Sequence, residues 1–489
     1  MLQLVELRMV SLDALNGPPD EALARLGRFA TAHRMDFLLR SQKAGTGLDH
    51  LGSNVTSKLA DWEIGIETHD DHRVFVAMHQ ERPLIRRIET EAGPFDTLHG
   101  WIKSEASLSD LKILIGNAGF TLSEATETAV VQWDTPGEMD TGVHVRATLR
   151  LDTDHQPATL TLTAAPDERK ALLAAAHEIV ETLPFLIVPV AVSNTSREPV
   201  KAAKLKLPKD AIPTDAFVAI GKSVAAHWFG NDAASRAGLE VEHVHQLRVA
   251  QRRLKTALKL FPDWIDDAWN TGIAPDLKWF GDLLGDARDW DVFTDTTLPA
   301  YAASDDPHRK AAWNPTQKAA DNNRTDARRR LQEAMNSPRY ARLALSYVEW
   351  FGTLAPPPNH TDQSLAEYAQ KRITKHYRKI ERAPDLTTLD AAKRHKVRIH
   401  AKRLRYALEF FRSMLTRKTR KQVEDALGSL QSVLGEGNDA AVAARRLADL
   451  KEAGEFQKGL AKGFAVNAQR MSATEGERIL RKIKPPRIK

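Results

Sequence analysis

A segment rich in arginine and lysine occurs twice in this chain, and the pair of copies constrains the fold more than any other feature. The first copy, VHQLRVAQRRLKTALKLF, covers residues 244–261, and the second, HKVRIHAKRLRYALEFF, covers residues 395–411. An offset of 150 residues pairs His245 with His395, Arg248 with Arg398, Arg252 with Lys402, Arg253 with Arg403 and Lys255 with Arg405. The same offset aligns LLGDARDWDV at 283–292 with VLGEGNDAAV at 433–442. Repetition in register over this length indicates an internal duplication.

Read with the period of an α-helix, the first copy has two distinct faces. An apolar stripe contains Val244, Leu247, Leu254, Leu258 and Phe261. A second face contains His245, Arg248, Arg252, Lys255 and Lys259. Like charges at these spacings destabilise a helix by roughly 0.2–0.5 kcal/mol per pair, so the row needs an anionic partner or a solvated surface. The recurrence of the same register favours the anionic partner.

Charge is divided unevenly along the chain. Residues 1–200 carry 18 Lys and Arg against 29 Asp and Glu, whereas the remainder carries 52 against 35. The basic part is therefore expected to bind a polyanion. No apolar run approaches the ~20 residues that span a bilayer. The absence of cysteine excludes disulfides and thiolate metal sites, and is typical of a cytoplasmic protein.

The first 200 residues show short alternating runs that are typical of strands. Strands are expected near residues 3–10, 61–67, 73–79, 84–89, 129–133, 143–152 and 159–164, and helices at 21–33, 107–118 and 167–182. Many short antiparallel strands with few helices predict an α+β domain, 1–200, built on a barrel or a sandwich.

Residues 201–213 read as a linker with lysine and proline, after which only helices are expected. A proline triplet at 356–358 divides this all-α domain, 214–489, into repeats of about 214–354 and 360–489. Helices are expected at 215–229, 240–260, 276–284, 288–296, 307–335, 338–354, 364–380, 389–415, 417–434 and 440–453. The basic C-terminal stretch RILRKIKPPRIK is expected to be a solvated or disordered end.

The opening strand resembles that of CYTH domains, which belong to the triphosphate tunnel metalloenzymes. In that family an eight-stranded tunnel binds a polyanion through Lys and Arg and metals through Glu and Asp. The family opens with Glu-x-Glu-x-Lys, where this chain has Leu4, Glu6 and Arg8, and the family's late acidic strand corresponds to Thr159–Thr163, which has no carboxylate. Because divalent metals need several carboxylate oxygens, the resemblance implies a degenerate barrel without activity. The alternative is a metal-dependent triphosphate or polyphosphate hydrolase.

The second part closely resembles the CHAD family, the conserved-histidine α-helical domains that often follow CYTH domains. The two basic segments, LLGDARDWDV and VLGEGNDAAV carry this resemblance. It implies a helical bundle with internal two-fold pseudosymmetry, whose basic faces line a central groove or pore. It also implies non-catalytic binding of inorganic polyphosphate and association with polyphosphate granules and their proteins. A nucleic-acid-binding protein is the other alternative, but the basic faces have few aromatic residues for stacking on bases.

The expected polyphosphate-binding residues follow from the paired basic faces. The principal ones are His245, Arg248, Arg252, Lys255, His395, Arg398, Lys402 and Arg405; the secondary ones are Arg253, Arg403, Lys259, Lys222, Lys371, His227 and His376. Arginine can bind phosphate oxygens with two hydrogen bonds, and lysine acts as a mobile charge. His227 and His376 could equally be ordinary surface histidines. No catalytic residue is expected, because no nucleophile with an oriented base is evident. No metal site or cofactor is expected either, because His243 and His245 would point apart on a helix and no carboxylates cluster beside the histidines.

In each copy of the shorter repeated motif, an aspartate follows the shared glycine by four residues. Asp289 follows Gly285, and Asp439 follows Gly435. We expect these carboxylates to be structural, capping a helix start or pairing with a motif arginine such as Arg253 or Arg403.

Overall fold

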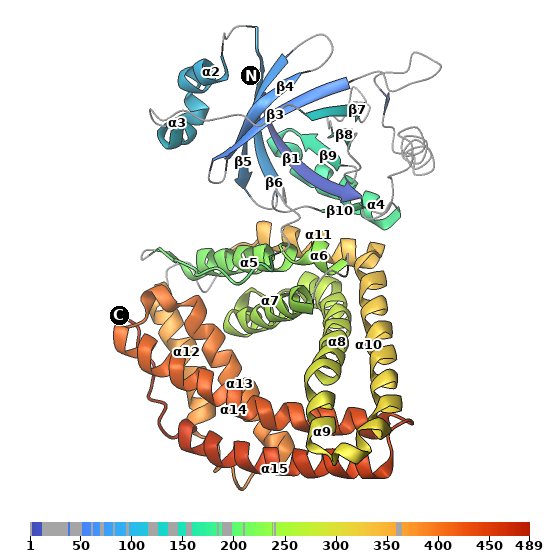
Figure 1. Cartoon of the computed structure of the whole chain (residues 1–489). Helices are drawn as coiled ribbons and strands as arrows, with labels where there is room; N and C mark the ends of the chain where they lie inside the picture. The colour runs from blue at the N-terminus through green and yellow to red at the C-terminus, as the bar shows by residue number, and fades with distance from the viewer. Residues whose placement is uncertain are drawn as a thin grey trace. The chain divides into compact units, whose positions relative to one another are not determined.

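The chain folds into two compact units, Met1–Asn194 with Ala334–Gly352, and Thr195–Glu333 with Thr353–Lys489. The computed structural model describes residues 2–11, 38–39, 51–59, 62–68, 73–81, 84–93, 97–115, 126–134, 145–152, 159–182, 185–187, 198–208, 211–236, 238, 241–357 and 364–489. Figure 1 shows strands in the first unit and helices in the second. The helix expected at 21–33 lies outside the described residues.

The first unit contains an antiparallel sheet, as predicted. Its strands are β1 (Leu2–Ser11), β2 (Leu38–Leu39), β3 (Leu51–Leu59), β4 (Trp62–Thr68), β5 (Arg73–Glu81), β6 (Leu84–Glu91), β7 (Thr126–Asp134), β8 (Val145–Asp152), β9 (Thr159–Ala164) and β10 (Phe185–Ile187). Their order is β10-β1-β6-β5-β4-β3-β7-β8-β9, with β2 paired to β7. β1 also pairs with β9, with Leu7 opposite Leu162.

One face of this sheet is apolar and covered by helices. Side chains alternate between faces along a strand, and on β4–β6 the residues of this face include Ile64, Phe75 and Ile88. They pack with Trp101 of α2 (Leu98–Ser104) and Leu111 of α3 (Ser109–Ile115). α4 (Arg169–Thr182) packs on β9, and α11 (Pro338–Gly352) packs on α4 and β10. The first unit therefore includes a helix from the middle of the chain.

Charged side chains are buried on the opposite face. Glu6 of β1 is fully buried and forms ion pairs with Arg8 and with Arg87 of β6, whose guanidinium lies 3.3 Å from Glu6. Arg87 also pairs with Glu89 at 2.6 Å. The two arginines and two glutamates thus neutralise one another, as buried charges must.

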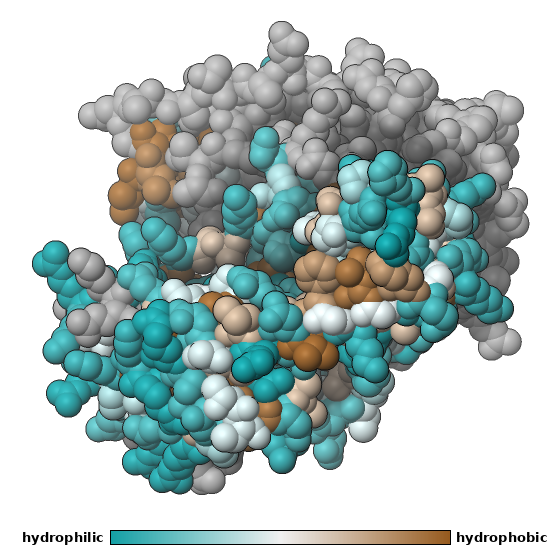
Figure 2. Space-filling view, turned by 60° about the horizontal axis from the view of Figure 1, so that its bottom comes forward, coloured by the Kyte–Doolittle hydropathy of each residue, from teal (hydrophilic) through white to brown (hydrophobic). Residues whose placement is uncertain are grey.

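The second unit is helical, as predicted. Its longer helices are α5 (Pro213–Phe229), α7 (Val241–Leu260), α8 (Ala274–Val292), α10 (Asn314–Met335), α12 (Leu365–Glu381), α13 (Ala391–Phe410), α14 (Arg417–Asp449) and α15 (Glu455–Leu480). Shorter ones are α6 (Asp232–Arg236) and α9 (Leu298–Ser304). In Figure 2, hydrophilic side chains cover most of the coloured surface, with smaller apolar patches between them. None of the helices described is long and apolar enough to cross a membrane.

Two pairs of predicted helices are wrong, because each pair is one continuous helix. Residues 276–284 and 288–296 belong to α8 and a π-helical turn, Phe293–Thr297, and residues 417–434 and 440–453 belong mostly to α14. Gly437 lies between two of the expected helices and serves close packing. A Cβ on Gly437 would lie 2.2 Å from the Ser472 hydroxyl of α15. Glycine is therefore required where α14 and α15 touch.

The alternative of a disordered C-terminal end is wrong, because apolar residues of this end pack onto the helical unit. α15 itself was not expected, since its hydrophobic pattern is irregular. Beyond it, Ile483 is buried and its carbonyl accepts a hydrogen bond from Tyr377. Ile488 forms a β-bridge with Leu415. Apolar residues thus anchor this stretch, while its lysines and arginines after Leu480 are exposed.

Candidate anion-binding site

The basic faces of α7 and α13 meet, and their cations form one cluster. Arg248 and Arg252 come from α7, and Arg398, Lys402 and Arg405 come from α13; these five residues are called the basic cluster below. Burial lowers the pKa of Arg252, and the positive charges of Arg248, Arg398 and Arg405 lower it further. The charges of Arg398 and Arg405 act across the interface between α7 and α13, whose backbones are in contact. The sequence offset alone could not establish that the two faces are neighbours.

Lys402 lies at the most crowded position of the basic cluster. Burial, and then the charges of Arg398, Arg252 and Arg248, lower the pKa of its ammonium group to about 7. In the part of the chain described, no side-chain hydrogen bond or ion pair is found for Lys402 or for Arg252, whose Nε is buried without a partner. Desolvated cations without acidic partners are costly in the empty protein. An anion bound here would lower that cost.

Two carboxylates pair with the basic cluster at equivalent positions. Arg248 lies 2.9 Å from Asp289 of α8, and Arg398 lies 3.7 Å from Asp439 of α14. Arg248 also donates to the Gly285 carbonyl at 2.5 Å. Both acids therefore pair with a motif arginine, as expected, but with Arg248 and Arg398 in place of the suggested Arg253 and Arg403. The expected cap, in contrast, is wrong, because Asp289 lies near the end of α8 and Asp439 inside α14.

The histidines of the two copies differ in their surroundings. His245 is half-buried, and its Nδ1 has no hydrogen-bond partner among the described residues. Burial, and the charges of Arg288, Arg252 and Arg248, lower its pKa, which the nearby Glu242 opposes. His395 is exposed, and its Nδ1 lies 2.7 Å from the side-chain oxygen of Asn438. Both histidines stand at the edge of the basic cluster on their own helices.

The remaining lysines are peripheral. Lys255 and Lys259 are exposed on α7, and the pKa of Lys255 is lowered by partial burial and by Arg248 and Lys278, against Asp282. Lys222 on α5 and Lys371 on α12 are exposed as well. These side chains can extend the positive surface without forming its centre.

Three predicted binding residues point into the protein instead of toward the basic cluster. Arg253 is 1% exposed, with its Nε 3.0 Å from Glu409 of α13, a terminal nitrogen 3.2 Å from the Ser223 hydroxyl, and its guanidinium over the Phe410 ring. His227 is 1% exposed and His376 4% exposed. Nε2 of His227 is 2.9 Å from the Gln246 side-chain oxygen, and Arg253 lies 3.5 Å from its Nδ1. Arg253 and His227 therefore join α5, α7 and α13.

Burial of the two histidines makes stability depend on pH. Burial is the main cause that lowers the pKa of His227, and of His376, to about 4. The unfolded chain takes up these protons near pH 6.5, before the native chain does. Stability should therefore fall as the pH drops from about 6.5 to about 4, by up to ~1.4 kcal/mol per pH unit for each histidine. Chemical denaturation at several pH values measures the slope.

Two histidine variants test whether His227, and not another titrating group, causes the pH dependence of stability. His227→Gln should flatten the slope, whereas His308→Gln, at an exposed position, should leave it unchanged. Equal slopes in wild type and His227→Gln would contradict the assignment.

Sequence analysis missed the arginines and acids that surround the basic cluster. Arg446 of α14 lies 3.0 Å from Asp286 and 3.9 Å from Asp289, with its guanidinium over the Trp290 ring. Arg446 follows the aligned motif at 433–442 by one helical turn, and this spacing is the sequence feature that could have indicated it. Arg288 of α8 acts on His245.

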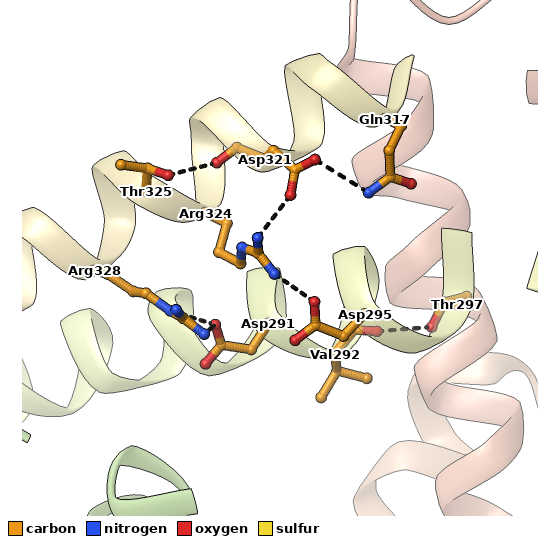
Figure 3. A network of polar contacts seen from close by, with 9 residues as sticks. All are labelled: Asp291, Val292, Asp295, Thr297, Gln317, Asp321, Arg324, Thr325 and Arg328. Atoms are coloured by element: carbon orange, nitrogen blue, oxygen red, sulfur yellow. Dashed lines mark hydrogen bonds and ion pairs between the residues drawn. The ribbon is translucent and has the colours of Figure 1, made fainter. Parts of the chain in front are cut away.

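Acids of the first short motif hold α10 against α8. Asp291 is 1% exposed and lies 2.6 Å from Arg328 of α10. Figure 3 shows this pair beside Arg324, which bridges Asp295 and Asp321. These acids are thereby neutralised away from the basic cluster.

Residues 219–448 match the CHAD domain family. The crystal structure of the CHAD domain from the plant Ricinus communis is 30% identical in sequence; the match covers 60% of this chain and 100% of that chain, with a TM-score of 0.53. PptA from Streptomyces chartreusis is 18% identical, and the match covers 56% of this chain and 99% of that chain, with a TM-score of 0.45. A search of curated proteins finds no match. The chain therefore belongs to the CHAD family, with its CHAD domain at residues 219–448.

Proposed function

We propose that this protein binds inorganic polyphosphate without catalysis, through the basic cluster of α7 and α13. The observation that carries the proposal is the convergence of Arg252 and Lys402, desolvated cations without acidic partners in the described chain, with Arg248, Arg398 and Arg405. His245 and His395 flank them. Arg253, His227 and His376 are left out of the proposed groove, because their burial gives them structural or separate roles.

A linear polyanion suits this arrangement better than a compact anion. The basic cluster draws on two helices, and exposed lysines extend it along α7. Polyphosphate carries about one charge per phosphate, and arginine can hold each group with two hydrogen bonds. The resemblance to CHAD domains implies polyphosphate binding and so supports the same ligand. Polyphosphate granules and their proteins would then be the cellular partners.

We further propose that α5, α7 and α8 form one repeat and α12, α13 and α14 the other. The equivalent pairs Arg248–Asp289 and Arg398–Asp439 support this. The two repeats would share a single groove.

For the first unit we propose a degenerate CYTH-like barrel. The pairing of β1 with both β6 and β9 supports this architecture. Glu6 is occupied by Arg8 and Arg87, so the carboxylate that the family would use for metal is already neutralised. This domain would then contribute no hydrolysis.

Calorimetry of the full chain with long-chain polyphosphate tests the main proposal. We expect binding that weakens about 100-fold between about 50 and about 200 mM salt, by the counterion-release argument applied to about five cations. DNA and RNA at matched charge should compete poorly. Equal competition by nucleic acid would favour the nucleic-acid alternative, and salt-insensitive binding would contradict the charged groove.

Lys402 should make binding proton-linked. Its ammonium group is largely neutral above pH 7 in the empty protein, and a bound anion favours the charged form. We expect uptake of about 0.5–1 proton at about pH 7.5, and weaker binding as the pH rises above about 7. Calorimetry in buffers of different ionisation enthalpy measures the uptake. Lys402→Arg should bind with less uptake, and unchanged uptake in that variant would assign the proton elsewhere.

A further inference from the structure

A second group of cations lies on the other side of α13. His400 and Arg403 are three residues apart and share one face of the helix. At about 100° per residue, that face is turned away from Arg398 and Lys402. α12 packs on α13 and contributes His376 and Lys379, again three residues apart. The charges of Lys379 and Arg403 act on both histidines, which places the four groups together.

Among the described residues, the two histidines each have a buried nitrogen without a hydrogen-bond partner, and the two cations, half-buried Arg403 and exposed Lys379, have no paired carboxylate. His376 is 4% exposed, and the buried nitrogen is Nδ1 in both His376 and His400. An empty protein that gathers such groups leaves them unsatisfied, and an anion would satisfy them.

The first repeat shows that this is not a shared structural device. There the equivalent histidine and arginine, His227 and Arg253, are satisfied by Gln246 and Glu409. At the offset of 150 residues, Gln246 corresponds to Lys396 and Glu409 corresponds to Lys259. Lysines therefore stand at both positions that would neutralise the pair of the second repeat: Lys396 on α13 replaces the amide, and Lys259 on α7 replaces the carboxylate.

We propose that His376, Lys379, His400 and Arg403 form a second anion site, which takes a single phosphate group. The site goes beyond the groove of the basic cluster and does not depend on it. Arg403 supplies two N–H donors in one plane, Lys379 supplies a mobile charge, and each histidine supplies one ring N–H. The phosphate group comes either from free phosphate or pyrophosphate, or from the end of a polyphosphate chain.

Side-chain ¹H–¹⁵N spectra of the full-length chain during titration with pyrophosphate test this site. We expect the His376 and His400 signals, assigned with His376→Gln and His400→Gln, to shift together and saturate. Lys379→Gln/Arg403→Gln should weaken the affinity read from these signals at least about tenfold, because it removes both charge-assisted donors. Arg252→Gln/Lys402→Gln carries the same change in charge and should leave it within about threefold. Unmoved histidine signals, or equal losses in the two double variants, would overturn the proposal.

Long-chain polyphosphate distinguishes the two sources. If the chain end occupies the site, polyphosphate alone shifts both histidines and pyrophosphate adds nothing. If the ligand is free, the signals move only when pyrophosphate is added. If only the proposed groove is wrong, Arg252→Gln/Lys402→Gln will leave the polyphosphate affinity unchanged, while pyrophosphate will still shift the histidine signals.

Discussion

Replacing Arg252 and Lys402 together with glutamine is expected to weaken polyphosphate binding at least about 100-fold. Each cation can donate charge-assisted hydrogen bonds to phosphate, worth roughly 1.5–3 kcal/mol. Two such losses amount to about 3–6 kcal/mol, and every 1.4 kcal/mol is about tenfold in affinity. The fold should not suffer, because neither side chain has an acidic partner to strand in the described chain. Calorimetry at one low salt concentration measures the change, with the melting temperature as a check.

The matched control removes two exposed or half-exposed lysines from α15. Lys458→Gln/Lys462→Gln makes the same change in net charge and should alter affinity less than about threefold. Arg248→Ala/Arg398→Ala should also weaken binding, but it removes the nearer cation from Asp289 and the paired cation from Asp439. That added repulsion makes it the less specific variant. Unchanged affinity in Arg252→Gln/Lys402→Gln would mean that the basic cluster is structural.

Helical period and internal offset predicted the basic cluster well. α7 and α13 begin and end within a few residues of their expected bounds, and the charges of Arg398 and Arg405 on α13 reach Arg252 on α7, a neighbourhood that the offset alone could not establish. The helical period alone could not predict which residues beside the cations of α7 are buried. Arg253 follows Arg252 by one residue, yet its partner Glu409 lies 156 residues away. Only the packing of α7 on α13 distinguishes the two arginines.

The glycines of the two repeats show a second limit of sequence analysis. In the first repeat Gln251 of α7 donates to the Leu277 carbonyl, and a Cβ on Gly281 would lie 1.9 Å from its amide nitrogen. In the second repeat the glutamine is on the other helix, where Gln431 of α14 donates to the Ala401 carbonyl at 3.3 Å. In the first repeat the glutamine is on α7 and the small residue, Gly281, is on α8. In the second repeat the small residue, Ala401, is on α13 and the glutamine is on α14. Nothing in the sequence explains a glycine at position 281 inside an expected helix, because its size is set by a neighbour on another helix.

Replacing Arg253 with alanine is expected to lower the free energy of unfolding by about 3 kcal/mol. Its side chain is 1% exposed, so truncation opens a cavity, and Glu409, at 32% exposure, loses its cation. His227 and Ser223 lose a donor as well. Chemical denaturation of the full chain, followed through the transition of the helical unit, measures the loss. Arg253→Met keeps most of the volume and should cost about half as much, because only the polar contacts are removed.

Arg403→Ala is the matched control, because Arg403 occupies the equivalent place in the second repeat. Its side chain is half-buried and has no paired carboxylate among the described residues. Its removal should cost less than about 1 kcal/mol, since it relieves repulsion with Lys379. Equal losses in Arg253→Ala and Arg403→Ala would contradict the division of roles. A large loss in Arg253→Ala alone would show that the first repeat uses its arginine to hold α7 on α13, while the second leaves its arginine available to an anion.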